Sequence, residues 1–276
     1  MQSLRTITTA IAVVLCSSIL AQSLHEVRVF AHRGGRYEQD ENTLQAFKNS
    51  YAKGYSGFET DVRMTKDGVL VISHDSKLDR TNTTSGVIEE MTAAELRKVV
   101  SKKGNPLLFL DDFLDFLKDK PNLYVEFEMK TTEHDLYPDE RMKEYADKLY
   151  KAVQSIHPEN ASLWFTSFDY RTLRYMMQKY PQGNYMAISS KPLDDATIDM
   201  ALALGVNTLA CTIHGTSRDA VRKAHKKGLT ISLWPGSCIE DTLLGFYLEA
   251  DRLCTDVPEA VKTFLDTRAP WLQAKY

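Results

Sequence analysis

Short apolar segments with the length of strands and amphipathic segments with the length of helices alternate along this chain from residue 27 onward. Strands are predicted at eight places, 27–31, 57–62, 123–128, 162–166, 185–188, 208–211, 230–234 and 252–255. Helices are predicted at eight others, 44–53, 110–118, 141–156, 171–179, 194–204, 218–227, 239–249 and 258–266. This alternation over about 250 residues is typical of a (β/α)8 TIM barrel of the α/β class. The alternative is a doubly wound open sheet, but no Gly-x-Gly-x-x-Gly turn follows any predicted strand.

One connection and two helix ends add detail to this fold. Residues 76–106 follow the second barrel strand and are too many for an ordinary βα loop. We expect this insertion to cover the mouth of the barrel and to select the alcohol part of a substrate. Asn42 and Gln45 are predicted to form a capping box at the first helix, and Pro258 fits the first turn of the last one.

The first 22 residues have the features of a secretory signal peptide. Arg5 provides a positive charge, residues 7–20 are almost wholly apolar or small, and Ala21 offers a small residue for cleavage. We therefore expect one domain at 23–276 that is exported and is periplasmic or secreted. No later stretch approaches the ~18 apolar residues of a transmembrane helix, so no stable membrane span is expected in the mature protein.

The charge of the chain bears on its partners, and its cysteines bear on whether it contains disulfides. The formal net charge is −3 and no long basic run is present, which makes nucleic acid an unsuitable partner. Beyond the leader, the cysteines are Cys211, Cys238 and Cys254, at wide spacing and without a Cys-x-x-Cys pair. They are expected to be buried as small hydrophobic side chains and to form no disulfide framework.

Carboxylates lie in pairs at the ends of two successive predicted strands. Glu59 and Asp61 are spaced i, i+2, as are Glu126 and Glu128 on the next barrel strand, so each pair lies on one side of its strand. The carboxyl ends of barrel strands meet at one face. Several carboxylates aimed at one point repel each other unless a hard cation such as Mg²⁺ or Ca²⁺ joins them, and the pattern therefore predicts one divalent cation.

Histidines and cations follow the same strand ends. His32 and His74 come directly after apolar segments and can serve as the base and the acid of one turnover. Arg33 offers a planar fork that suits phosphate oxygens, and Lys130 offers a point charge beside the carboxylates. Together these residues indicate a metal-assisted phosphodiesterase. Phe168 and Trp234 are further candidates for contact with the substrate.

The order of these motifs resembles that of the glycerophosphodiester phosphodiesterase family over essentially the whole mature chain. The matching motifs are His32-Arg33-Gly34, Glu41-Asn42-Thr43, Glu59-x-Asp61, Lys66-Asp67-Gly68, His74-Asp75, Leu78-x-Arg80-Thr81, Glu128-x-Lys130, Ser167-Phe168-Asp169, Trp234 and Thr255-Asp256-x-Pro258. The resemblance implies a barrel with a small insertion after its second strand.

The resemblance also implies a role for each matching residue. It makes Glu59, Asp61 and Glu128 the metal ligands and leaves Glu126 outside that trio. His32 and His74 match the acid/base pair, and the resemblance makes Arg33 and Lys130 the phosphate-binding cations. The substrate it implies is a small-molecule glycerophosphodiester, cleaved to sn-glycerol 3-phosphate and an alcohol.

Two departures from the family pattern bear on the choice of substrate. Asp40 stands where the family commonly has proline, and Pro235-Gly236-Ser237 replaces a Thr/Val-Asn step after the tryptophan. Alternatives to the main hypothesis are a lysophospholipase D, a phospholipase C-type phosphodiesterase, or a non-catalytic phosphodiester-binding protein. A long apolar groove in the insertion would favour the first two, yet residues 81–86 are polar. A binding protein would tolerate the loss of one histidine, and both are present.

Overall fold

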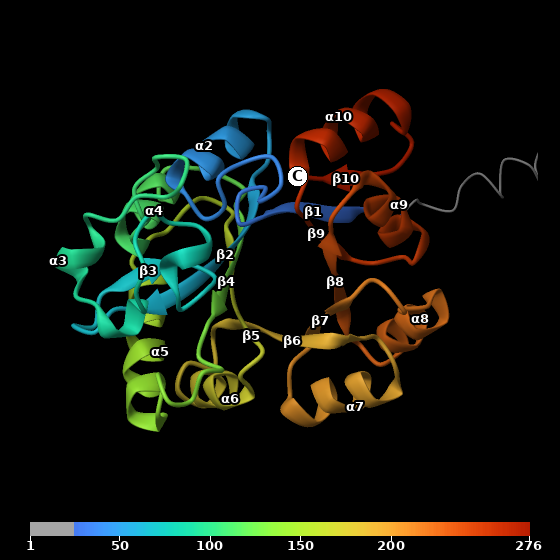
Figure 1. Ribbon diagram of the computed structural model, residues 1–276. Coiled ribbons are helices and arrows are strands. Elements are labelled where there is room, and N and C mark those ends of the chain that lie inside the picture. Colours follow the sequence, from blue (N-terminus) through green and yellow to red (C-terminus); the bar gives the residue numbers. More distant parts are fainter. Residues whose placement is uncertain (1–24) are drawn as a thin grey trace, which may run out of the picture.

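The computed structural model describes residues 25–276, in which eight parallel strands form a closed ring (Figure 1). The barrel strands are β1 (Val27–His32), β2 (Gly57–Met64), β4 (Tyr124–Met129), β5 (Ser162–Ser167), β6 (Asn184–Pro192), β7 (Thr208–Thr212), β8 (Thr230–Gly236) and β9 (Arg252–Thr255). β1 pairs in parallel with β2 on one side and with β9 on the other. The predicted (β/α)8 barrel is therefore confirmed, because in an open sheet β1 would pair with only one of these two strands. The predicted signal peptide, residues 1–22, lies outside the described residues.

Helices surround the ring and cover the outward side of its strands (Figure 1). They are α2 (Leu44–Ala52), α4 (Leu110–Leu117), α5 (Asp139–Val153), α6 (Tyr170–Lys179), α7 (Asp195–Leu204), α8 (Arg218–Lys226), α9 (Ile239–Tyr247) and α10 (Pro258–Arg268). On α2, the ring of Phe47 lies 5.7 Å from that of Phe58 on β2 and 4.4 Å from that of Phe113 on α4. Since side chains alternate along a strand, the apolar core on the outside leaves the inward side for other groups. Within residues 25–276, no helix combines the length and the apolar character that crossing a bilayer requires.

The two predicted helix ends had different outcomes. Pro258 occupies the first turn of α10, as predicted. The helix begins at Leu44 as predicted, but the capping box at α2 was wrong, because the N-cap is Thr43 and not Asn42. Oγ1 of Thr43 accepts a hydrogen bond from the backbone N–H of Ala46 at 3.2 Å. Asn42 instead takes a left-handed backbone conformation, with φ of 57°, and its side chain contributes to the site described below.

A hairpin returns the chain from β2 to the mouth of the barrel. β3 (Leu70–Ile72) runs antiparallel to the C-terminal end of β2, with Val62 opposite Ile72. The backbone N–H of Ser73 then donates to the carbonyl oxygen of Asp61 at 3.0 Å. The segment before His74 is therefore the return arm of a hairpin and not a barrel strand, and it brings the histidine back to the level of Asp61.

The insertion at 76–106 lies beside the barrel, on the side of β2 and β3 (Figure 1). It contains the short helix α3 (Ala93–Leu96) and a small core of its own, made by Leu78, Ile88, Leu96 and Val99 together with Val71 and Phe109. The expectation that the whole insertion covers the mouth was wrong. Most of the segment packs against β3 through its own apolar residues instead. Only some of its residues, among them Ser76, Lys77, Asp79 and Arg80, border the site.

The three cysteines within residues 25–276 are free thiols, and two of them are buried as predicted. Cys211 on β7 and Cys254 on β9 are buried, whereas Cys238, which immediately precedes α9, is only half-buried. The position of Cys238 corrects the prediction that all three are buried. A helix N-cap lies at the end of an element, where solvent reaches more easily than in the core.

Candidate active site

Three carboxylates converge where β2 and β4 lie side by side. The register places Glu59 opposite Glu126 and Asp61 opposite Glu128, so the two i, i+2 pairs form one inward-facing cluster. Within this cluster, one oxygen each of Glu59, Asp61 and Glu128 lies within 4.8 Å of the others. All three residues are buried. The predicted trio is thus brought together by strand pairing.

The carboxylate trio has the properties of a divalent-cation site. Oε1 of Glu59 and Oδ1 of Asp61 are buried without a hydrogen-bond partner among the described residues. Burial and the neighbouring charges of Asp61 and Glu128 raise the pKa of Glu59 well above its usual value. Burial also acts to raise the pKa of Asp61, but the positive charges of Arg33 and Lys130 hold it below its usual value. Oxygens left unpaired at one point are what a hard cation would satisfy, so these residues fit one.

Glu126, the fourth acidic residue, has a separate partner. The hydroxyl of Tyr124 donates to Oε1 of Glu126. Burial raises the pKa of Glu126 to about 7, although that hydrogen bond acts in the opposite direction. This arrangement agrees with leaving Glu126 outside the metal-binding trio.

Asn42 orients Asp61, a role that the sequence analysis missed. Its Nδ2 donates to Oδ2 of Asp61 at 2.8 Å, and its Oδ1 accepts from the hydroxyl of Thr60 at 3.0 Å. Oδ2 of Asp61 is thereby occupied, which leaves Oδ1 as the oxygen without a hydrogen-bond partner among the described residues. The signal in the sequence was the position of Asn42 within Glu41-Asn42-Thr43, because asparagine tolerates the left-handed conformation found here.

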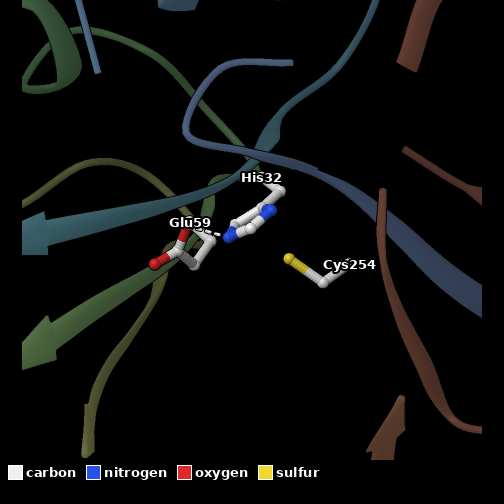
Figure 2. A group of neighbouring side chains, drawn as sticks. All are labelled: His32, Glu59 and Cys254. Atoms are coloured by element: carbon white, nitrogen blue, oxygen red, sulfur yellow. Dashed lines mark ion pairs between the residues drawn. The ribbon is translucent and has the colours of Figure 1, made fainter. Parts of the chain in front are cut away.

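His32 ends β1 and lies between two carboxylates. Its Nδ1 pairs with Oδ1 of Asp256, which follows β9, and its Nε2 lies 3.6 Å from Oε2 of Glu59 (Figure 2). Asp256 as a carboxylate only accepts, so a neutral His32 carries its proton on Nδ1 and a lone pair on Nε2. Burial lowers the pKa of His32 below its usual value, although the hydrogen bond to Asp256 acts in the opposite direction. The ring is therefore prepared to accept a proton at Nε2.

Asp256 is the second functional residue that the sequence analysis did not assign. Nε of Arg36 forms an ion pair with its Oδ1 at 2.9 Å, and the hydroxyl of Ser237 donates to its Oδ2 at 3.2 Å. The side chain is fully buried. Its place directly after the last barrel strand, in the motif Thr255-Asp256-x-Pro258, was the available signal, but His32 is 224 residues away along the chain.

His74 reaches the same cavity from the β3 side and is more exposed than His32. Its Nδ1 pairs with Oδ1 of Asp75 at 2.6 Å, and 33% of its side chain is accessible, against 12% for His32. The guanidinium of Arg63, on β2, donates to the carbonyl oxygen of His74 at 2.8 and 3.1 Å. A buried arginine thus fixes the backbone from which this histidine projects.

The two predicted phosphate-binding cations lie on either side of Asp61. Nε of Arg33 is 3.2 Å from Oδ2 of Asp61, and Nη1 donates to Oε1 of Glu41 at 3.1 Å. Nη2 of Arg33 makes no hydrogen bond within residues 25–276. Lys130 donates to Oε1 of Glu128 at 2.7 Å, and its Nζ lies 3.5 Å from Oδ1 of Asp61. Both cations are therefore held beside the carboxylates, and each keeps N–H groups that can donate to a further ligand.

These residues surround a cavity of about 180 Å³ at the mouth of the barrel. Its lining includes His32, Arg33, Glu59, His74, Glu128, Phe168 and Trp234. The rings of Phe168 and Trp234 meet edge to face, with centroids 5.8 Å apart. Lys130 lines an adjoining groove of about 500 Å³, and His74 borders both spaces. Asp61 lies behind the lining and is fully buried.

Comparisons with known proteins agree with this arrangement. The model of the glycerophosphoryl diester phosphodiesterase family matches residues 32–260. The glycerophosphodiester phosphodiesterase of Caldanaerobacter subterraneus subsp. tengcongensis is 28% identical over 240 residues, which are 84% of this chain and 95% of that protein.

Two solved structures share the fold. A glycerophosphodiester phosphodiesterase from Parabacteroides distasonis superposes with a TM-score of 0.74 at 22% identity, covering 89% of this chain and 98% of that one. An Oleispira antarctica phosphodiesterase, solved in complex with the product sn-glycerol-3-phosphate, gives a TM-score of 0.77 at 20% identity and covers 87% and 97% of the two chains.

Proposed function

This chain belongs to the glycerophosphoryl diester phosphodiesterase family and is a glycerophosphodiester phosphodiesterase, and we propose that it releases sn-glycerol 3-phosphate with His32 and His74 moving the protons. One observation carries the proposal. A carboxylate cluster with unpaired oxygens, a buried histidine held by Asp256 and a second histidine all meet at one cavity. The product named for the Oleispira antarctica phosphodiesterase supports the same substrate class.

We propose that Glu59, Asp61 and Glu128 hold one divalent cation, Mg²⁺ or Ca²⁺. An oxygen-only set of ligands suits these hard cations, and the buried unpaired oxygens on Glu59 and Asp61 support the assignment. When bound, such a cation polarises a phosphoryl oxygen and offsets the negative charge of the transition state.

Arg33 and Lys130 are proposed to hold the phosphate from two sides. Nη2 of Arg33 is available to a phosphate oxygen, and its other nitrogens are held by Asp61 and Glu41. Those two carboxylates keep the fork in one orientation, which lets it bind without a further loss of side-chain freedom. Lys130 adds a point charge from the adjoining groove.

We propose that His32 is the base and His74 the acid. Burial favours the neutral form of His32, whose Nε2 lone pair can take the proton of the attacking hydroxyl. His74 borders both the cavity and the more open groove, where a departing alkoxide can take its proton and leave. Phe168 and Trp234 are proposed to contact the apolar parts of the substrate inside the cavity.

The experiment that tests this function is incubation with a panel of glycerophosphodiesters, followed by detection of sn-glycerol 3-phosphate. The panel contains a small and a bulky alcohol, and a lysophospholipid is included as a comparison. We expect release of sn-glycerol 3-phosphate from the diesters. Cleavage confined to the lysophospholipid, or binding without turnover, would contradict the proposal.

Replacing Asp256 by asparagine should lower kcat by as much as ~10⁴-fold, because an amide can hold His32 in the tautomer with its proton on the wrong nitrogen. The pH profile should change as well. Asp256 raises the pKa of His32, so its loss lowers that pKa further and moves the acidic limb of kcat/KM to lower pH. The measurement is kcat/KM against pH for both proteins.

Asp251→Asn is the matched control for this change. Asp251 also binds a histidine, His225, at 2.9 Å, but it precedes β9 whereas Asp256 follows that strand. This variant should keep both kcat and the pH profile. Equal losses in the two variants would show that Asp256 acts on the fold and does not position His32.

We also propose that the protein is exported, since its first 22 residues have the pattern of a signal peptide. The mass of the protein recovered outside the cytoplasm tests this, with an N-terminus near Ser23 expected. Protein that retains Met1 and stays in the cytoplasm would contradict it.

A further inference from the structure

A thiol lies in the active-site cavity beside the base. Cys254, on β9, lines the cavity together with His32 and Glu59 (Figure 2). Sγ of Cys254, a ring nitrogen of His32 and an oxygen of Glu59 all lie within 4.8 Å of one another. Neither the carboxylate trio nor the proposed proton transfers use this sulfur.

The three side chains offer a different chemistry from the carboxylate trio. Imidazole nitrogen, thiolate sulfur and carboxylate oxygen together are the ligand set of Zn²⁺, whereas Mg²⁺ and Ca²⁺ prefer oxygen alone. His32 also has the supporting contact typical of a zinc ligand, since its Nδ1 is held by Asp256 and its Nε2 faces Glu59. Sulfur therefore makes this group selective for a softer cation.

The three side chains are held in buried, fixed positions that suit a metal ion. Glu59 is 5% exposed and its Oε1 has no hydrogen-bond partner among the described residues. Cys254 is 6% exposed, and its place on a barrel strand fixes its direction. Nε2 of His32 and Oε2 of Glu59 are 3.6 Å apart, close to the separation of two ligands around one zinc ion.

We propose that His32, Glu59 and Cys254 form a binding site for a thiophilic divalent cation, Zn²⁺, and that binding of Zn²⁺ at this site inhibits the enzyme. On binding, a sulfur–zinc bond forms and the thiol proton passes to solvent, with no change of oxidation state. The inhibitory part rests on the proposed function. A lone pair of His32 that binds zinc cannot accept a proton. Glu59 belongs both to this site and to the carboxylate trio.

Cobalt absorption tests the binding part without any measurement of turnover. Co²⁺ is added to the full protein in excess Mg²⁺, and thiolate-to-cobalt absorption in the near ultraviolet is recorded. The band should appear in the wild type, persist in Cys238→Ser and vanish in Cys254→Val. Absence of the band in the wild type, or its loss with Cys238→Ser instead, would overturn the site. Should the valine variant not fold, Cys254→Ala makes the same comparison.

Zinc titration of hydrolysis tests the inhibitory part. With Mg²⁺ saturating, each protein is compared with its own activity before Zn²⁺ is added. Cys254→Val should require at least a tenfold higher Zn²⁺ concentration for half-inhibition, and Cys238→Ser should match the wild type. Equal sensitivity in all three proteins, or a cobalt band without zinc inhibition, would overturn inhibition through Cys254. An inactive wild type that still shows the band would instead count against the proposed function.

Discussion

Replacing His32 by alanine should lower kcat by about 10²–10⁴-fold on every diester, whatever its leaving group. The base is needed to activate the attacking hydroxyl in each case. His74→Ala should lose a similar factor only with a poor leaving group such as an alkyl alcohol, because a nitrophenolate departs without a proton. The measurement is kcat for one alkyl and one nitrophenyl diester in both variants.

The control for these two variants is His225→Ala. His225 is also paired with an aspartate, Asp251, but it lies outside the cavity. Its replacement should leave kcat unchanged with both substrates. If the nitrophenyl diester rescued His32→Ala and not His74→Ala, the two roles would be reversed. Near-native turnover of the alkyl diester by either variant would remove that histidine from catalysis.

Removal of the divalent cation should reduce turnover by about 10³-fold or more, since the several kcal/mol that a cation contributes correspond to such a factor. Chelation should abolish activity, and Mg²⁺ or Ca²⁺ should restore it. Glu128→Gln should bind the cation far more weakly than the wild type, because it removes one charged oxygen from the trio. The measurements are calorimetric Mg²⁺ affinity and turnover after dialysis against chelator.

Glu126→Gln provides the matched control on the same strand. Glu126 is also buried and faces the same cavity, but its Oε1 is occupied by Tyr124. We therefore expect this variant to keep its Mg²⁺ affinity. Full activity in excess chelator, or an equal loss of affinity in the Glu126 and Glu128 variants, would contradict the assignment of the trio.

The barrel was predictable because its signal is local. Each strand needs only a few apolar residues and each helix an apolar stripe, and both patterns are read within a short window of sequence. β3 was harder to place. An apolar segment of that length fits a barrel strand as well as the return arm of a hairpin, and only its antiparallel pairing with β2 decides between them.

The site was predictable where one strand carries the whole pattern. Glu59 and Asp61, or His32 and Arg33, are close neighbours along the chain, so their chemistry follows from the residue types and their spacing. Asn42 and Asp256 escaped assignment because their partners lie far along the chain. The contact of Asn42 with Asp61 joins a loop to a barrel strand, and that of Asp256 with His32 joins the last strand to the first.

The sequence by itself determined the eight segments that form the barrel strands and that carboxylates two positions apart share a side, because alternation is a property of any extended chain. Tertiary structure alone decided which side faces inward, that Glu59 stands opposite Glu126, and that the end of the last strand reaches the first. These outcomes depend on the register between strands and on closure of the ring. Both are set by packing of the whole core, a sum over many distant contacts that no local pattern contains.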